Sequence, residues 1–165
     1  MLEIEQLLNL ESQDSTPELI CANVAKVFGV RPTEIALLQL SGNLLKFVHP
    51  PELKKAGAIP LSSASVAART ARIRRPDLFN TFTRVKHSSV FEVVKIGETE
   101  AGAEIIQKLM SVPVTDASGE VIGVIQVSRK AHSPSAAGPD FSAEDLRKLQ
   151  SIAVAVARVL AKDKV

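Results

Sequence analysis

The sequence contains no tryptophan, no tyrosine and only six phenylalanines in 165 residues. The core must therefore be aliphatic, and the flat aromatic side chains on which bases and sugars stack are scarce. The 20 lysines and arginines nearly balance the 18 aspartates and glutamates. Such a balance does not predict a nucleic-acid-binding or membrane-binding surface. We therefore expect no nucleic-acid partner and no membrane partner.

Cysteine is almost absent as well, because Cys21 is the only one. A lone thiol excludes an intramolecular disulfide and favours a reducing compartment. The acidic start of the chain lacks the basic region of a secretion signal. The most apolar stretch, residues 152–161, is shorter than a bilayer span and contains Arg158. These observations predict a cytoplasmic protein.

Helical patterns stand near both ends of the chain. Residues 2–9 and 17–28 each place apolar side chains along one face. Thr16 is expected to cap the second of these helices, and Gly29 to end it. At the other end, Ser142 and Asp145 form a Ser-x-x-Asp capping pattern that predicts a final helix.

The strongest strand pattern is a pair of aliphatic runs, residues 105–114 and 120–128, joined by a turn-rich loop. Strict alternation puts Val121 and Gly123 on one face of the second run and Ile122 on the other. Since both faces are largely apolar, we expect a central strand covered on both sides.

A second hairpin and a middle region precede the long one. Residues 34–48 contain two apolar-rich runs with a tight turn at Ser41-Gly42. Ser62 or Ser63 is then positioned to cap a helix, and the pattern of residues 89–96 favours a helix over a strand.

Three segments resemble the GAF domain family. Residues 109–114, Leu-Met-Ser-Val-Pro-Val, are similar to a family strand that ends in an apolar-Pro-apolar step. Residues 119–127 are similar to its strand of the form G-x-aliphatic-aliphatic-G. Residues 141–146, Phe-Ser-Ala-Glu-Asp-Leu, are similar to its F-[ST]-x-x-D-L helix start. The resemblance covers roughly residues 16–162.

The resemblance implies an α+β domain with a GAF/PAS-like fold. Its central antiparallel sheet has about six strands, with the N- and C-terminal helices bundled on one face. A variable helix and loop segment lies over a small-molecule pocket on the other face. On this basis residues 1–14 form an N-terminal helix and connector, and residues 15–163 form the GAF-like domain.

GAF domains sense cyclic nucleotides, tetrapyrroles, amino acids and other ligands, or act only as dimerisation modules, so the fold does not choose among these. Reduction of free methionine sulfoxide, which some relatives perform, needs a second thiol that this chain lacks. The cyclic-nucleotide motif is also incomplete, because Thr81 rather than lysine follows Asn80. The three histidines have no zinc-binding spacing. We expect no metal site. The sequence does not identify a cofactor, and His87 is the candidate for an axial haem ligand.

A basic cluster lies in the segment that would border the pocket. Arginine forks bind carboxylates and phosphates bidentately, so the cluster suggests a small anionic ligand. The alternative is a solvated helix face whose arginines pair with nearby glutamates. The candidate ligand-binding residues are Arg69, Arg72, Arg75, Asn80, Arg84 and His87.

The leading hypothesis is a small-molecule-sensing regulatory domain that acts in signal transduction through a dimer or a signalling protein partner. The alternative is a dimerisation or scaffold module without a ligand, and an enzyme ranks third because no catalytic constellation is present. Either leading function predicts a homodimer through the terminal helices, because the last helix is apolar nearly all round. The candidate interface residues are Leu7, Leu8, Ile20, Val24, Ile152, Val156 and Val159.

Overall fold

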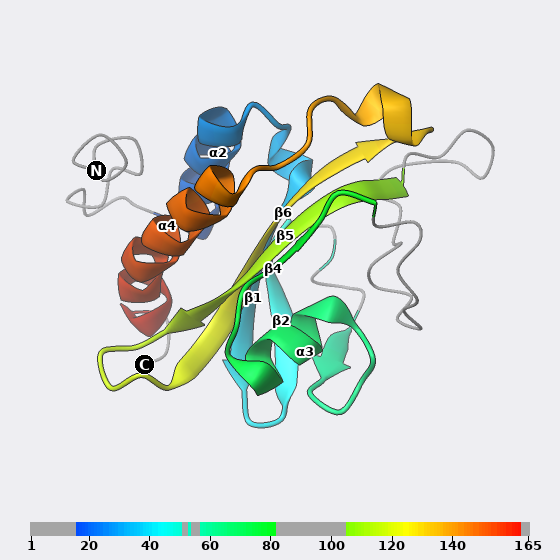
Figure 1. Cartoon of the computed structure of the whole chain (residues 1–165). Coiled ribbons are helices and arrows are strands. Elements are labelled where there is room, and N and C mark those ends of the chain that lie inside the picture. The colour runs from blue at the N-terminus through cyan, green and yellow to red at the C-terminus, as the bar shows by residue number, and fades with distance from the viewer. Residues whose placement is uncertain (1–15, 51–52, 54–56, 82–104, 163–165) are drawn as a thin grey trace.

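The computed structural model describes residues 16–50, 53, 57–81 and 105–162. They form a six-stranded antiparallel sheet in the order β3-β2-β1-β6-β5-β4 (Figure 1). The strands are β1 (Ile35–Ser41), β2 (Leu44–His49), β3 (Ala58–Pro60), β4 (Asp77–Phe79), β5 (Ile105–Thr115) and β6 (Val121–Ala131). The predicted α+β fold and the long central hairpin are confirmed.

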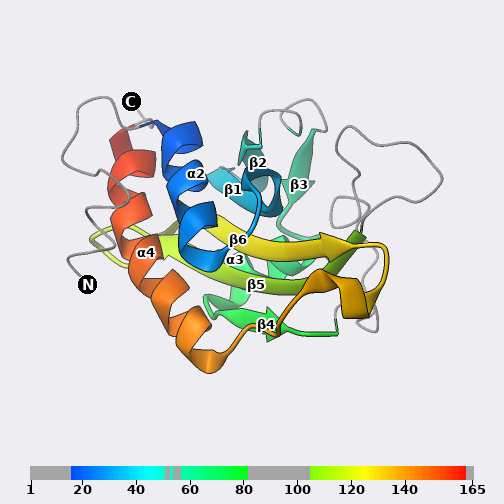
Figure 2. The same ribbon diagram turned by 90° about the horizontal axis from the view of Figure 1, so that it is seen from above.

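Helices cover both faces of this sheet. The helices α2 (Pro17–Phe28) and α4 (Ala143–Lys162) lie side by side on one face, the α2/α4 face (Figures 1 and 2). The short helix α3 (Val66–Ile73) covers part of the opposite face, the α3 face. Two 3-10 helices, η1 (Pro32–Glu34) and η5 (Pro134–Ala137), complete the regular structure of the described residues. None of the helices in these ranges is long and apolar enough to cross a bilayer.

The ends of α2 are fixed by the residues that the sequence predicts. The hydroxyl oxygen of Thr16 accepts a hydrogen bond from the Leu19 amide at 3.2 Å. Gly29 follows the helix with a φ of +66°, a left-handed conformation that favours glycine. Its amide donates to the carbonyls of Ala25 and Lys26, so the last turn is satisfied.

The start of α4 forms a reciprocal capping box. The Asp145 amide donates to Ser142 Oγ at 3.0 Å, and the Ser142 amide donates to Asp145 Oδ2 at 2.9 Å. Two amides that lack partners inside the helix are thereby satisfied, as predicted. For α3 the predicted cap lies two or three residues too early, because Ser65 rather than Ser63 or Ser62 accepts the bond from the Ala68 amide.

A bulge in β6 changes which face two of its side chains occupy. The pairing of β5 with β6 shifts register between Val114 and Thr115. Ile122 therefore packs in the core under α2 and α4, whereas Val121 packs against the core under α3. Strict alternation predicted the reverse, and the extra residue of a bulge is what breaks alternation.

Five residues predicted at a dimer interface are core residues of the single chain. The apolar half of α4 packs against two neighbours, the sheet and α2. Both belong to the same chain, so a second chain is not needed to bury it. The exposed large apolar side chains of these two helices are Leu19 and Val154. The homodimer stays a prediction, and residues 2–9 with Leu7 and Leu8 lie outside the described residues. The five buried residues, none more than 7% exposed, are Ile20, Val24, Ile152, Val156 and Val159.

Candidate functional site

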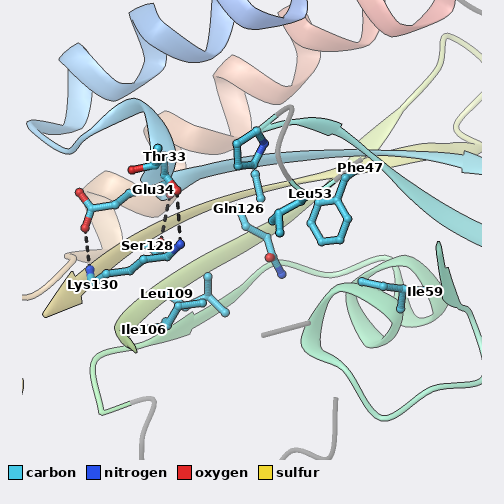
Figure 3. Close-up of a pocket in the computed structure, with 12 residues that line it drawn as sticks. Thr33, Glu34, Phe47, Leu53, Ile59, Ile106, Leu109, Gln126, Ser128 and Lys130 are labelled. Atoms are coloured by element: carbon cyan, nitrogen blue, oxygen red, sulfur yellow. Dashed lines mark hydrogen bonds between the residues drawn. The ribbon is translucent and has the colours of Figure 1, made fainter. Parts of the chain in front are cut away.

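The α3 face of the sheet contains a cavity beside the helix (Figure 3). Among the described helices, only the eight-residue α3 covers this face, whereas α2 and α4 fill the other face. The space it encloses is about 30 Å³, room for one or two water molecules. The lining residues are Thr33, Glu34, Ala36, Phe47, Pro50, Leu53, Ile59, Ile106, Leu109, Gln126, Ser128 and Lys130.

Most of the cavity wall is apolar and well buried. Leu109 and Ile59 are at most 1% exposed, and Phe47 and Leu53 are 8% exposed. These side chains come from β5, β3 and β2 and from the turn after β2. A wall of this kind favours an apolar group and excludes bulk water.

One end of the cavity is polar, and its carboxylate is already occupied. Glu34 Oε1 accepts from the Arg31 amide at 2.8 Å. Glu34 Oε2 accepts from the Lys130 amide at 2.6 Å (Figure 3). Arg31 Nε also lies 3.3 Å from Oε1. Glu34 therefore joins η1 to the end of β6.

A chain of buried hydrogen bonds joins the cavity floor to α3. Gln126 Nε2 donates to Ser111 Oγ at 3.1 Å, and Ser111 Oγ lies 2.7 Å from Thr70 Oγ1. Thr70 Oγ1 in turn donates to the Val66 carbonyl at 2.9 Å. Thr70 and Ser111 are fully buried, so the chain holds Gln126 in one orientation at the edge of the cavity.

The predicted arginines do not line this cavity. Arg69 and Arg72 lie on the exposed face of α3, three residues apart, and Arg75 is exposed just beyond the helix. Arg72 Nη1 donates to the Ser63 carbonyl at 2.8 Å and to the Leu61 carbonyl. Arg69 Nη2 lies 3.9 Å from an oxygen of Asp77. Their role in ligand binding stays a prediction, and Arg84 and His87 lie outside the described residues.

Asn80 is placed at the start of α4 instead of in the cavity. Its Nδ2 donates to the Phe141 carbonyl at 2.9 Å, and its Oδ1 accepts from the Phe141 amide at 2.8 Å. Phe141 is only 2% exposed, and the Arg129 guanidinium stacks over its ring at 4.8 Å. Asn80 thus anchors the segment that leads into α4.

Asn80→Ala is expected to lower the free energy of unfolding by about 2 kcal/mol, because two buried backbone groups of Phe141 lose their partners. For a domain of this size the melting temperature should fall by about 4–8 °C. Calorimetry of the variant beside Thr81→Ala, a change at the exposed neighbouring residue, measures the difference. Equal melting temperatures for the two variants would show that Asn80 does not anchor α4.

Cys21 is buried in the core of the α2/α4 face and has no exposed surface. Burial raises the pKa of its thiol to about 12, and the nearby Glu18 carboxylate adds to the increase. The thiolate is the reactive form of cysteine, so this thiol is chemically quiet in the folded protein.

We expect Cys21 to react with a disulfide reagent at pH 8 about a thousandfold more slowly than in the unfolded chain, from its thiolate fraction alone. The raised pKa also predicts that wild type loses stability relative to Cys21→Ala as the pH rises from 9 toward 12. The reason is that only the unfolded chain releases this proton there. Fast labelling of the native protein would contradict both statements.

Sequence reasoning missed Gln126 and Ser128, which are buried polar residues on the central strand β6. The available signal was their position as polar exceptions in an otherwise aliphatic run. No group of three or more histidine, cysteine, aspartate or glutamate residues that could hold a metal occurs in the part of the chain that the structure describes.

The GAF domain family matches residues 18–160. The chain belongs to this family. The match takes in nearly all of α2 and α4 and every strand of the sheet, so this GAF domain occupies nearly the whole chain. No curated protein sequence matches it.

Solved structures agree with the family assignment. The GAF domain of an Acinetobacter phosphoenolpyruvate-protein phosphotransferase is similar, with a TM-score of 0.71 and 14% identity over 96% of this chain and 90% of that chain. The corresponding domain from Coxiella burnetii has a TM-score of 0.70 and 11% identity over 99% of this chain and 94% of that chain. A type II free methionine-R-sulfoxide reductase from Thermoplasma acidophilum has a TM-score of 0.61 and 18% identity over 96% and 95%. At these identities the likeness shows the fold alone, and the similar structures include GAF domains of phosphotransferases and a free methionine-R-sulfoxide reductase.

Proposed function

We propose that this GAF domain is a regulatory module that binds a small molecule in the cavity on the α3 face of its sheet. One observation supports this most strongly: a buried apolar wall is interrupted there by the side chains of Gln126 and Ser128 beside open space. Small-molecule sites commonly combine apolar walls with a few placed polar groups. The opposite face of the sheet is packed by α2 and α4.

The output of the module would pass through α4, either to a second copy of the chain or to a signalling partner. Two side chains, one directly after β4 and one on β5, hold the segment before α4. Asn80 binds the backbone of Phe141, and the buried ammonium of Lys108 pairs with Asp140 and contacts the Asn80 carbonyl at 3.3 Å. A change in β4 or β5 on ligand binding would therefore act directly on the start of α4.

A catalytic role is not part of the proposal. Reductases of free methionine sulfoxide share the fold, but thiol chemistry needs an accessible thiolate and a resolving partner. Within these 165 residues the single cysteine is buried, and its pKa is raised to about 12. The lone cysteine also supports a cytoplasmic location.

The small size of the cavity favours a second candidate, a dimerisation or scaffold module that binds no ligand. A space of about 30 Å³ takes only a small chemical group unless its wall moves. The exposed Val154 on α4 is available for contact with another chain. A monomer in sedimentation experiments at micromolar concentration would argue against this candidate and against the predicted homodimer.

The proposed function is tested by filling the cavity. Ala36→Leu adds apolar volume to the wall, whereas Ala143→Leu adds the same volume at an exposed position of α4. Compounds that raise the melting temperature of wild type should also raise that of Ala143→Leu, and should lose their effect on Ala36→Leu. If every stabilising compound acts equally on both variants, the cavity is not the binding site.

A further inference from the structure

We infer that the cavity is selective for an uncharged ligand group that donates a hydrogen bond, an N–H or O–H, and that the amide oxygen of Gln126 accepts this bond. The inference rests on the function proposed above and specifies the chemistry of its ligand. It departs from the anionic ligand that the arginine cluster suggested.

The direction of the buried hydrogen-bond chain determines how the Gln126 amide is turned. Thr70 donates its only hydroxyl proton to the Val66 carbonyl, so its oxygen accepts from Ser111. Because the Ser111 hydroxyl donates its one hydrogen to Thr70, its oxygen can only accept a hydrogen bond from Gln126 Nε2. The reversed amide would place Oε1 against an oxygen that has no proton to give.

The remaining oxygen of Gln126 belongs to the cavity wall. Gln126 lines the cavity, is only 6% exposed, and its amide is seen among the lining side chains in Figure 3. Among the described residues no donor contacts this oxygen. An amide oxygen that has no donor from the protein can accept a hydrogen bond from a bound donor group.

The neighbouring Ser128 side chain also presents a hydrogen-bond acceptor to a ligand. Ser128 Oγ donates its proton to the Glu34 carbonyl at 3.1 Å, so only its lone pairs can face a ligand. The Lys130 ammonium contacts the Thr33 carbonyl at 3.4 Å, and the Glu34 carboxylate is paired with Arg31. A carboxylate or phosphate would meet acceptors at Gln126 and Ser128, which disfavours it.

The volume limits the size of the group that enters. A space of about 30 Å³ suits a few heavy atoms, such as a primary amide or a hydroxymethyl group. Acetamide and acetate are matched probes, because they have the same shape and differ in one NH₂ group and one negative charge.

Both probes are titrated into isotope-labelled protein, and the side-chain amide of Gln126, the Ser128 amide and the Leu109 methyl groups are followed by NMR. We expect acetamide to shift these signals and acetate to bind about tenfold more weakly or not at all. In Ser111→Ala the Gln126 amide is free to turn its NH₂ toward the cavity, so the preference for acetamide should shrink. Gln126→Met removes the amide and should abolish the preference.

Acetate binding as tightly as acetamide in wild type, or an unchanged preference in Ser111→Ala, would overturn the inference while leaving the cavity a ligand site. If neither probe shifts the cavity signals, the inference also fails. The cavity-filling pair Ala36→Leu and Ala143→Leu then decides separately whether the proposed function stands. Should Gln126→Met fail to fold, the comparison of wild type with Ser111→Ala still decides the inference.

Discussion

Val156→Glu is expected to unfold the domain, whereas Val154→Glu, two residues earlier in the same helix, should leave its stability nearly unchanged. Val156 has no exposed surface and lies in the core between α4 and the sheet, while Val154 is 64% exposed. Burying an unpaired carboxylate costs more than about 4 kcal/mol, against a total stability of roughly 5–15 kcal/mol for a typical domain. Chemical denaturation followed by circular dichroism measures both variants.

The same pair of variants separates the core of the chain from a surface between two chains. If the outer face of α4 forms a dimer, Val154→Glu should dissociate it without unfolding the monomer, which sedimentation detects. A folded, monomeric Val156→Glu protein would contradict the core assignment and would return Val156 to the interface that the sequence predicted.

Gly123→Ala should lower the free energy of unfolding by about 3 kcal/mol, because the added methyl has no space. A Cβ at this position would lie 2.4 Å from the backbone oxygen of Leu38 and 2.8 Å from Leu160 Cδ1. Leu160 can change its rotamer, but the Leu38 carbonyl belongs to the neighbouring strand β1 and cannot move independently of the sheet.

Gly119→Ala is the matched control for this effect. Gly119 has a φ of +87° and nothing within 4 Å of an added Cβ, so its substitution costs only backbone strain, about 1 kcal/mol. We also expect Leu160→Ala to give little rescue of Gly123→Ala, since the contact with Leu38 remains. A smaller loss for Gly123→Ala than for Gly119→Ala, measured by denaturation, would show that β6 is not packed as described.

Sequence reasoning succeeded where structure depends on nearby residues. Thr16 and Gly29 fix the ends of α2, and Ser142 with Asp145 fixes the start of α4, through bonds that span only a few residues. The long central hairpin was also predictable, because its aliphatic runs are interrupted by a clear turn. These elements carry most of the sheet and the α2/α4 face.

Prediction failed where a feature depends on how elements meet. The turn between β1 and β2 occupies Gly42 and Asn43, one residue later than expected, because Ser41 still pairs with Leu44. The bulge in β6 depends on its register with β5, which no local pattern reveals. The sequence of an apolar helix such as α4 shows that it must pack against other elements, but not whether those elements belong to the same chain.

The candidate site was also difficult to predict, because it depends on how elements meet. The cluster of arginines predicted an anion-binding site. In α3, however, Arg69 and Arg72 point outward while alanines face the sheet. Gln126 had no distinguishing local context. It bonds Ser111, 15 residues away, and Ser111 bonds Thr70, a further 41 residues away. Such a hydrogen-bond chain exists only after the sheet and α3 have assembled.

The most direct test of a ligand site on the α3 face is a compound screen against protein labelled at its isoleucine, leucine and valine methyl groups. Binding compounds should shift the methyl signals of Ile59, Ile106 and Leu109, which line the cavity. Those of Leu149 and Ile152, in the core of the α2/α4 face, should shift little. Compounds that shift only the second set, or a broad screen that never moves the first, would contradict a ligand site on this face.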